Sequence, residues 1–406
     1  MTLLPIPLLI NLLLGLLSLA IVVAGLALIA NAIVRSRRRR PIAREKTIDQ
    51  RQKRVRIAQP VASGTVETDA SQHLLPWKWL LPGVLLLLVA FLGRHIVQLG
   101  LPNGDDEPQR TRFGTVRTLS RADGTTIHAE VYGPTNAPTL VLTHGWGVSS
   151  TEWYYAKRQL SDRFRLIVWD LPGLGLSAQP QDRNLALEKM AADLRAVSKL
   201  ADGKRFVLVG HSIGGMINIT FCRLYPELLG SPVAGIVQVD TTYTNPVRTT
   251  KDASFALALQ KPVAEPVLHV IIPLSPVVRM LNWLSYQSGF AQIYNAHSSF
   301  GGSETREQVD FVSQFQYRSS PAVVARGTPA MFHWDGTSVL PHINTPVLIV
   351  VGNQDTTTLP AASERMQQLI PAAQLQRINS GAHYSLLEQN QKVNAAVAEF
   401  AARMLK

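Results

Sequence analysis

The residues with the clearest chemical potential surround a serine that lies between two glycines. Residues 210–214 read Gly-His-Ser-Ile-Gly, after an apolar strand-like run at 206–209 and before a helical pattern. A sharp turn between a strand and a helix lifts the serine hydroxyl above the sheet and admits only small residues two positions to either side. The motif therefore predicts a nucleophile at Ser212, with the N–H groups that begin the helix pointing at the reacting oxygen.

A serine hydroxyl needs a base before it can attack, and two residues downstream could provide and orient one. Asp355 comes after a predicted strand at 347–351, and His383 follows the next predicted strand at 375–379. The chain order Ser212, Asp355, His383 is the order found with this serine motif. We expect His383 to act as the base and then to protonate the leaving group, while Asp355 holds the imidazole and stabilises its charged form.

Together these motifs resemble the α/β-hydrolase fold family, over roughly residues 113–406. Two more segments are similar to family motifs: Thr-His-Gly-Trp-Gly at 143–147 resembles the His-Gly oxyanion segment, and Asp-Leu-Pro-Gly-Leu-Gly-Leu-Ser at 170–177 resembles the family's Asp-x-x-Gly-x-Gly-x-Ser turn. The resemblance implies that the backbone N–H groups of Trp146 and Ile213 hold the oxyanion. It also implies a structural role for Asp170.

Asp240 is a second candidate for the acid of the triad. It ends a strand-like run at 236–239, the position where some members of the family carry their acid. Asp355 is preferred because Gly352 and the helix that follows match the commoner arrangement. His144 and His211 adjoin the catalytic segments, and we expect them to pack and to form hydrogen bonds that support the site.

The elements that must position these residues alternate along the chain. Strand-like runs lie at 115–120, 126–132, 140–143, 166–169, 206–209, 236–239, 347–351 and 375–379. Helical patterns lie at 185–200, 216–229, 361–370 and 386–404. The alternation predicts an α/β fold with a mostly parallel, doubly wound sheet and helices on both faces. We expect residues 110–240 and 346–406 to form this α/β-hydrolase core.

The alternation breaks between residues 241 and 345. This segment is rich in proline and aromatic residues. Connections longer than about 15 residues without structure of their own are uncommon in compact domains. We therefore expect a mostly helical cap, or lid, over 241–345, and its aromatic content indicates an apolar substrate.

Two apolar segments precede the core. Residues 8–34 form a run of about 27 residues, or roughly 40 Å as a helix, which exceeds the thickness of a hydrocarbon core. No basic residue precedes the run, and it is too long for a cleaved signal peptide, so we expect a transmembrane helix within residues 1–34. Residues 74–101 predict a second transmembrane helix, although Pro82 and Gly83 interrupt it. The alternative is an interfacial helix lying on the bilayer.

A basic loop between these segments sets their orientation. Most of the net charge of +12 comes from Lys and Arg between Arg35 and Arg56. Loops of this kind are cytoplasmic, so we expect residues 35–73 inside and, with two spans, the hydrolase domain outside the cytoplasm at a bacterial inner or plasma membrane. If the second segment does not span, that domain is cytoplasmic. The remainder is nearly neutral, which argues against a nucleic-acid-binding face.

The expected chemistry needs neither a cofactor nor a metal. The single cysteine, Cys222, cannot form an internal disulfide and has apolar neighbours that indicate a buried position, and no Cys/His spacing predicts a metal site. An acyl-serine route suits small-molecule esters, thioesters and lipid esters. Acyl transfer and cofactor-free perhydrolase or lyase chemistry would use the same triad. A catalytically retired, membrane-tethered scaffold is the non-enzymatic alternative.

Overall fold

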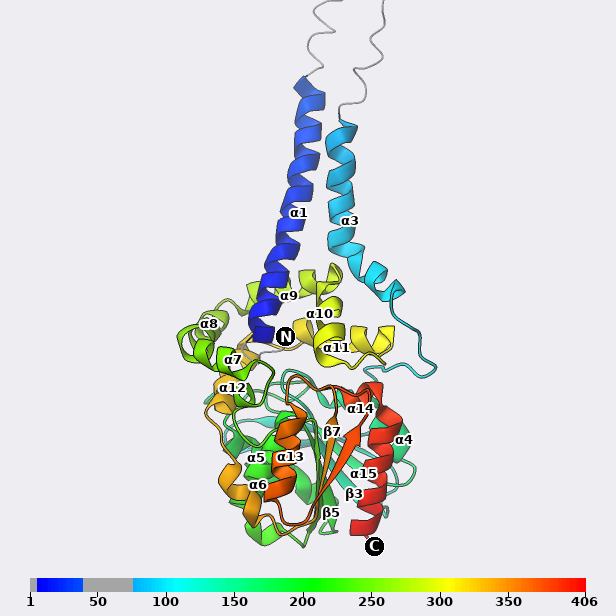
Figure 1. Ribbon diagram of the computed structural model, residues 1–406, viewed down its shortest axis with the longest axis vertical. Helices are drawn as coiled ribbons and strands as arrows, with labels where there is room; N and C mark the ends of the chain where they lie inside the picture. Colours follow the sequence, from blue (N-terminus) through cyan, green and yellow to red (C-terminus); the bar gives the residue numbers. More distant parts are fainter. Residues whose placement is uncertain (1–5, 39–75) are drawn as a thin grey trace, which may run out of the picture.

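The computed structural model describes residues 6–38 and 76–406. Three parts follow one another along its long axis: two long N-terminal helices, a layer of shorter helices, and an α/β domain (Figure 1). Most of the basic loop predicted at 35–73 lies outside the described residues, so its cytoplasmic position stays a prediction.

An eight-stranded sheet forms the centre of the α/β domain, in the order β1-β2-β4-β3-β5-β6-β7-β8. β2 pairs antiparallel with β1 and β4, and all the other neighbours are parallel. The strands are β1 (Thr115–Ser120), β2 (Thr126–Tyr132), β3 (Thr139–Thr143), β4 (Arg165–Trp169), β5 (Phe206–His211), β6 (Val233–Val239), β7 (Val347–Gly352) and β8 (Ala373–Ile378). β3 to β7 are buried along their whole length because helices cover both faces, which explains their continuous apolar runs. The predicted mostly parallel sheet is confirmed.

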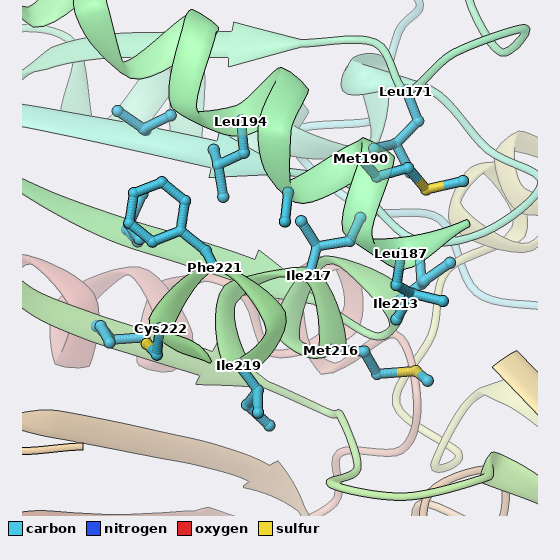
Figure 2. Close-up of a cluster of buried hydrophobic side chains, with 14 of the residues drawn as sticks. Leu171, Leu187, Met190, Leu194, Ile213, Met216, Ile217, Ile219, Phe221 and Cys222 are labelled. Carbon is cyan, nitrogen blue, oxygen red and sulfur yellow. The ribbon is translucent and has the colours of Figure 1, made fainter. Parts of the chain in front are cut away.

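Each face of the sheet has its own apolar core. On one face lie α5 (Leu187–Ser198), α6 (Ile213–Leu224) and α13 (Pro360–Leu369). On the other lie α4 (Tyr154–Leu160), α14 (Ser385–Glu388) and α15 (Asn390–Met404). Figure 2 shows the first core, where Leu194 of α5 lies near Ile217 and Phe221 of α6. Cys222 is buried on the same helix, as its neighbours predict. These cores hold α6, and therefore the turn before it, rigidly against the sheet.

Two helices end differently from the sequence expectation. α6 ends at Leu224 rather than at residue 229, because Pro226 disfavours helical backbone at the residue before it and has no N–H to donate. The helix predicted at 386–404 is divided into α14 and α15 at Gln389, whose backbone angles of φ −116° and ψ 35° are not helical. The spacing of apolar residues alone does not predict a break of the helix at Gln389.

The segment between β6 and β7 folds as a layer of helices. They are α7 (Ala253–Leu259), α8 (Glu265–Ile271), α9 (Ser275–Gln287), α10 (Phe290–Ser299), α11 (Arg306–Arg318) and α12 (Pro321–Phe332). A π-helical turn, Gln260–Ala264, joins α7 to α8, and the chain bends by 102° before α9. The structure also contains short 3₁₀ helices at Ser150–Trp153, Lys199–Ala201, Pro226–Leu228, Pro246–Arg248 and Thr337–His342. The layer lies between the sheet and the N-terminal helices (Figure 1).

The N-terminal helices α1 (Ile6–Arg38) and α3 (Trp77–Leu99) run side by side away from this layer (Figure 1). Their backbones meet where Gly25 faces Gly83, and a Cβ on Gly83 would lie only 2.8 Å from the carbonyl oxygen of Gly25. The segments Leu9–Ser36 and Trp77–Leu99 are each long and apolar enough to cross a membrane. Small residues that allow close backbone approach are typical of packed membrane helices.

The first turns of α1 pack directly on the helical layer. Gly15 approaches Leu281 of α9 so closely that a Cβ at position 15 would lie 2.6 Å from the Leu281 Cβ. Ser18 Oγ lies 2.9 Å from Ser288 Oγ, just after α9, and both hydroxyls are buried. α1 is therefore packed against the helices that cover the sheet, and is not simply tethered to them by a linker.

Candidate active site

Ser212 occupies a strained turn between β5 and α6. Its backbone has φ 52° and ψ −120°, a conformation that a residue with a side chain adopts only when its surroundings impose it. The turn is closed on both sides: a Cβ on Gly210 would lie 2.4 Å from the carbonyl carbon of Gly214, and one on Gly214 would lie 2.4 Å from the carbonyl oxygen of Thr143. This close approach is the physical reason for glycine at both positions of the motif.

The three residues predicted as a triad come together at the carboxyl edge of the sheet. Ser212 Oγ lies 3.2 Å from His383 Nε2, and His383 Nδ1 lies 2.9 Å from Asp355 Oδ2. Asp355 is 1% exposed and is held by the N–H groups of Thr357 and Thr358 and by the Thr358 hydroxyl. With Nδ1–H donating to Asp355, Nε2 is left as the acceptor for the Ser212 hydroxyl.

Asp240 lies close by but faces elsewhere. Its Oδ1 accepts a hydrogen bond of 2.8 Å from the Gly352 N–H, and its Oδ2 accepts one of 2.5 Å from the Ser385 hydroxyl. Complete burial, and then the charge of Asp355, raise the pKa of the Asp240 carboxyl well above its usual range. Asp240 therefore ties the end of β7 to the start of α14, and the imidazole contact belongs to Asp355.

The two residues predicted for the oxyanion come from different segments of the chain. Ile213 is the first residue of α6, so its N–H has no intrahelical acceptor. Trp146 lines the same cavity as Ser212 and His383. Its indole N–H contacts the Thr328 hydroxyl and the Val324 carbonyl on α12, which links this loop to the helical layer.

A buried carboxylate that the sequence analysis missed connects the catalytic loops. Glu152 is fully buried, accepts a 2.8 Å hydrogen bond from the Gly145 N–H and lies 3.2 Å from His211 Nδ1. His211 Nε2 in turn donates to the carbonyl oxygen of His383, at 2.9 Å. The supporting hydrogen bonds expected of His211 are confirmed. Glu152 belongs to no motif identified in the sequence. The one signal that could have pointed to it is its position shortly after the His-Gly segment at 143–147.

Glu152 also changes the charge state of His211. Burial by itself lowers the pKa of this imidazole, but the charge of Glu152 and the hydrogen bond to it outweigh burial and raise the pKa to about 9. His144 differs, because burial is the dominant effect there and lowers its pKa. Its Nε2 accepts from the Leu171 N–H, at 2.9 Å. The two histidines thus support the site in different charge states.

Asp170 has the structural role that the resemblance implies. Its carboxylate accepts hydrogen bonds from the N–H groups of Ser150 and Leu176, at 2.8 and 2.9 Å, and forms an ion pair with Arg112 at 3.0 Å. Burial opposes its charged form, but Arg112 and these hydrogen bonds outweigh burial and lower its pKa. Asp170 thus closes the turn after β4 and has no contact with Ser212 or His383 among those that the structure describes.

A cavity of about 230 Å³ lies between Ser212 and the helical layer. It is lined by apolar side chains, including Val148, Met216, Phe315, Val324 and Met331. It is also lined by amide and hydroxyl side chains of α1, α9, α10 and α11. The chamber can therefore hold a neutral, partly apolar molecule beside the serine hydroxyl.

Comparisons with known proteins define the class. The family model for the alpha/beta hydrolase fold matches residues 138–389. This match covers more than half of the chain, so the chain belongs to the α/β-hydrolase fold family. It is a hydrolase enzyme.

The individual proteins that this chain resembles are identical to it at only about a quarter of the aligned residues. The RutD protein of Stutzerimonas stutzeri, named as a candidate carbamate hydrolase, is 25% identical over 270 residues, which cover 66% of this chain and 94% of that protein. Human protein ABHD8 is 28% identical over 272 residues, covering 64% of this chain and 54% of its own. A thermophilic esterase from Thermogutta terrifontis superposes with a TM-score of 0.57 at 24% identity, covering 73% of this chain and all of the esterase. At this identity the structural likeness shows the fold alone.

The pKa of His211 leads to a testable dependence of stability on pH. Its folded pKa of about 9 lies above the ordinary value of 6.5, so charged His211 stabilises the fold fully below pH 6.5, and this contribution is lost as the pH rises through about 9. A shift of this size corresponds to a free energy on the order of 3 kcal/mol. We expect the melting temperature of the wild type to exceed that of His211→Gln by more at pH 6.5 than at pH 9.5. A gap that is constant or wider at pH 9.5, measured in one detergent, would contradict this.

Proposed function

We propose that this protein is a membrane-anchored serine hydrolase that cleaves ester-type substrates through an acyl intermediate on Ser212. The observation that carries the proposal is the hydrogen-bonded series Asp355–His383–Ser212, with separations of 2.9 and 3.2 Å. The 3.2 Å between the nucleophile and the base lies at the upper end of hydrogen-bond reach, as is common without substrate. The substrates are esters, thioesters or lipid acyl groups.

Each residue has a defined part in the reaction. His383 Nε2 takes the proton as Ser212 Oγ bonds to the acyl carbon, and the Trp146 and Ile213 N–H groups stabilise the negative oxygen. The imidazolium then protonates the departing alcohol, which leaves an ester on Ser212. Water deprotonated by His383 attacks this ester, and the proton returns to Ser212 as the acid departs. Asp355 stabilises the imidazolium in both halves.

The anchor of the proposed enzyme consists of α1 and α3. Their outward side chains are exposed and apolar, for example Leu13, Val23, Leu85 and Leu92. Exposure of such a surface to water is unfavourable in free energy, whereas the hydrocarbon core of a bilayer is apolar like the surface itself. In this proposal residues 35–73 are cytoplasmic, and the core (110–240 and 346–406) and the cap (241–345) lie outside the cytoplasm.

Exposed apolar side chains on the cap support the proposal that the cap lies at the membrane surface. Beside the N-terminal helices, α8, α9 and the bend between them expose a group of large apolar side chains: Val270, Leu274, Val277 and Met280, each between 46 and 55% exposed. Phe91 of α3 contacts Trp283 of α9, with ring centroids 6.1 Å apart, so this apolar face is continuous with the helices. A face of this kind would rest in the interfacial region of the same bilayer.

An active-site probe tests the nucleophile directly. We expect a fluorophosphonate to label the detergent-solubilised wild type, because a base-activated serine attacks phosphorus as it attacks an acyl carbon. Labelling should be lost in Ser212→Ala. Ser149→Ala, which changes a buried serine outside the triad, serves as the control and should label. A folded wild type that does not react would support the scaffold alternative.

The two neighbouring aspartates offer a matched pair of substitutions. Asp355→Asn should lower kcat for ester hydrolysis by about 10⁴-fold, because an amide cannot hold the required tautomer or stabilise the imidazolium. Asp240→Asn should retain most of the activity, since the amide is nearly isosteric and the residue does not contact His383. Both are read from initial rates with a chromogenic ester. The opposite ranking would assign the acid to Asp240.

The sidedness of the anchor has its own test. A reporter enzyme active only outside the cytoplasm, fused after Lys406, should be active, because two spans return the chain to the outer side. The same reporter fused after Arg56 should be inactive. An expressed but inactive fusion at Lys406 would contradict the two-span arrangement and leave the serine chemistry untouched.

A further inference from the structure

The cavity that contains Ser212 and His383 also contains hydrogen-bond acceptors without donors. Among the described residues, the side-chain oxygens of Asn11, Asn282 and Gln316 are buried and have no hydrogen-bond partner. All three side chains line the cavity that also contains Ser212 and His383. They come from α1, α9 and α11, so three separate helices bring the same kind of group to one chamber. Buried polar atoms in folded proteins normally have partners, so three unpaired acceptors in one place indicate a ligand.

Hydrogen bonds within the cap fix which end of two amides faces the cavity. The Asn282 amide nitrogen donates to the backbone carbonyl of Gln316, at 2.9 Å. The Gln316 amide nitrogen donates to Asn295 Oδ1, at 3.1 Å, and the Asn295 nitrogen donates to Ser313 Oγ, at 2.9 Å. Because their N–H₂ groups are engaged inside the cap, Asn282 and Gln316 can present their oxygens as acceptors. Asn282 is only 6% exposed, so bulk water does not satisfy it.

The third acceptor comes from the N-terminal helix. Asn11 is one of three polar residues in the apolar run 8–34, with Ser18 and Asn31. The packing of Gly15 on Leu281 and the contact of Ser18 with Ser288 hold this part of the helix on the cap. A membrane anchor alone has no need of an amide at this position. α1 therefore forms part of the wall of the substrate chamber.

The absence of charged side chains from the described lining of the cavity narrows the chemical class of the ligand further. No Lys, Arg, Asp or Glu is among the described residues that line it. A phosphate or carboxylate would find no cation there, and an ammonium group would find no carboxylate. The three acceptors instead match neutral O–H or N–H donors.

We propose that Asn11, Asn282 and Gln316 form a polar subsite that accepts hydrogen bonds from a neutral hydroxylated or amide-bearing part of the substrate. The substrate would then be an ester with an apolar acyl chain and a neutral hydrogen-bonding alcohol portion, of which a glycerol monoester is the simplest case. This inference rests on the proposed ester hydrolysis at Ser212. The apolar side chains of the cavity would contact the acyl chain, and the subsite would select the alcohol.

The test compares three octanoate esters on the full-length wild type in one detergent. They are glycerol monooctanoate, propyl octanoate, which lacks the two hydroxyls, and 2-acetamidoethyl octanoate, which offers an N–H instead. We expect kcat/KM for the glycerol ester to exceed that for the propyl ester by at least about tenfold, because a site built to pair with hydroxyls discriminates against the analogue without them. If the amide ester shows the preference instead, the donor that the subsite binds is an N–H.

Near-isosteric variants assign any preference to the subsite. Asn11→Leu, Asn282→Leu and Gln316→Met should each reduce the ratio of the glycerol ester to the propyl ester by about three- to tenfold, which is the effect of one lost hydrogen bond. Asn31→Leu is the matched control: the same change on the same helix, far from the chamber, should leave the ratio unchanged. Fluorophosphonate labelling verifies that each variant has a folded triad.

The outcomes separate this inference from the proposed function. If the wild type hydrolyses all three esters at similar kcat/KM, the subsite inference is overturned and the serine hydrolase stands. A preference that persists in all three variants also overturns it. If the wild type neither hydrolyses any ester nor reacts with the fluorophosphonate, the proposed function fails, and the subsite inference fails with it.

Discussion

The close approach of three backbone segments at Ser212 is the constraint on which the rest of the structure depends. A turn with φ 52° at a serine is unfavourable, and it persists because β5 before it and α6 after it are both packed into large cores. Ser212 N–H donates to the carbonyl of Val239 on β6, at 3.0 Å. Gly214 touches the end of β3. The serine hydroxyl is thus held in place by strands on both sides of β5, and its position follows from the packing of the whole sheet.

Buried carboxyl groups then set the loops around this fixed point. Glu152 joins the oxyanion segment to His211, and His211 joins both to the backbone of His383. Asp240 connects Gly352 to Ser385, and Glu388 accepts from the N–H groups of Ala382 and Gly301. Burial raises the pKa of Glu388 to about 7. Each carboxyl group bridges segments far apart in sequence, so these groups transmit the rigidity of the core to the loop that carries His383.

The N-terminal helices connect the membrane proposal to the chemistry. If α1 served only as a tether, it would have no reason to pack on α9 or to contribute Asn11 to the chamber. Its packing means that α1, the cap and the triad form one contiguous body. Under the membrane proposal, a substrate from the bilayer would meet the apolar surface of the cap first and the amides only inside the cavity. This arrangement explains how an apolar cap can coexist with a group of oriented amides.

The sequence by itself determined the elements whose signals are local. The serine turn, the order of its partners, the alternating strands and helices and the two apolar N-terminal segments could all be read from it, because a strained turn demands glycine at set positions and burial demands apolar residues at set periods. The sequence favoured Asp355 over Asp240 as the acid of the triad, but only the tertiary structure placed the Asp355 carboxylate against His383, because both aspartates follow parallel strands and packing sets the direction of each side chain. The contacts of Glu152 and Asn11 likewise could not be predicted from the sequence. Their roles arise from contacts between segments far apart in the chain, and such contacts leave no period or spacing in the residues themselves.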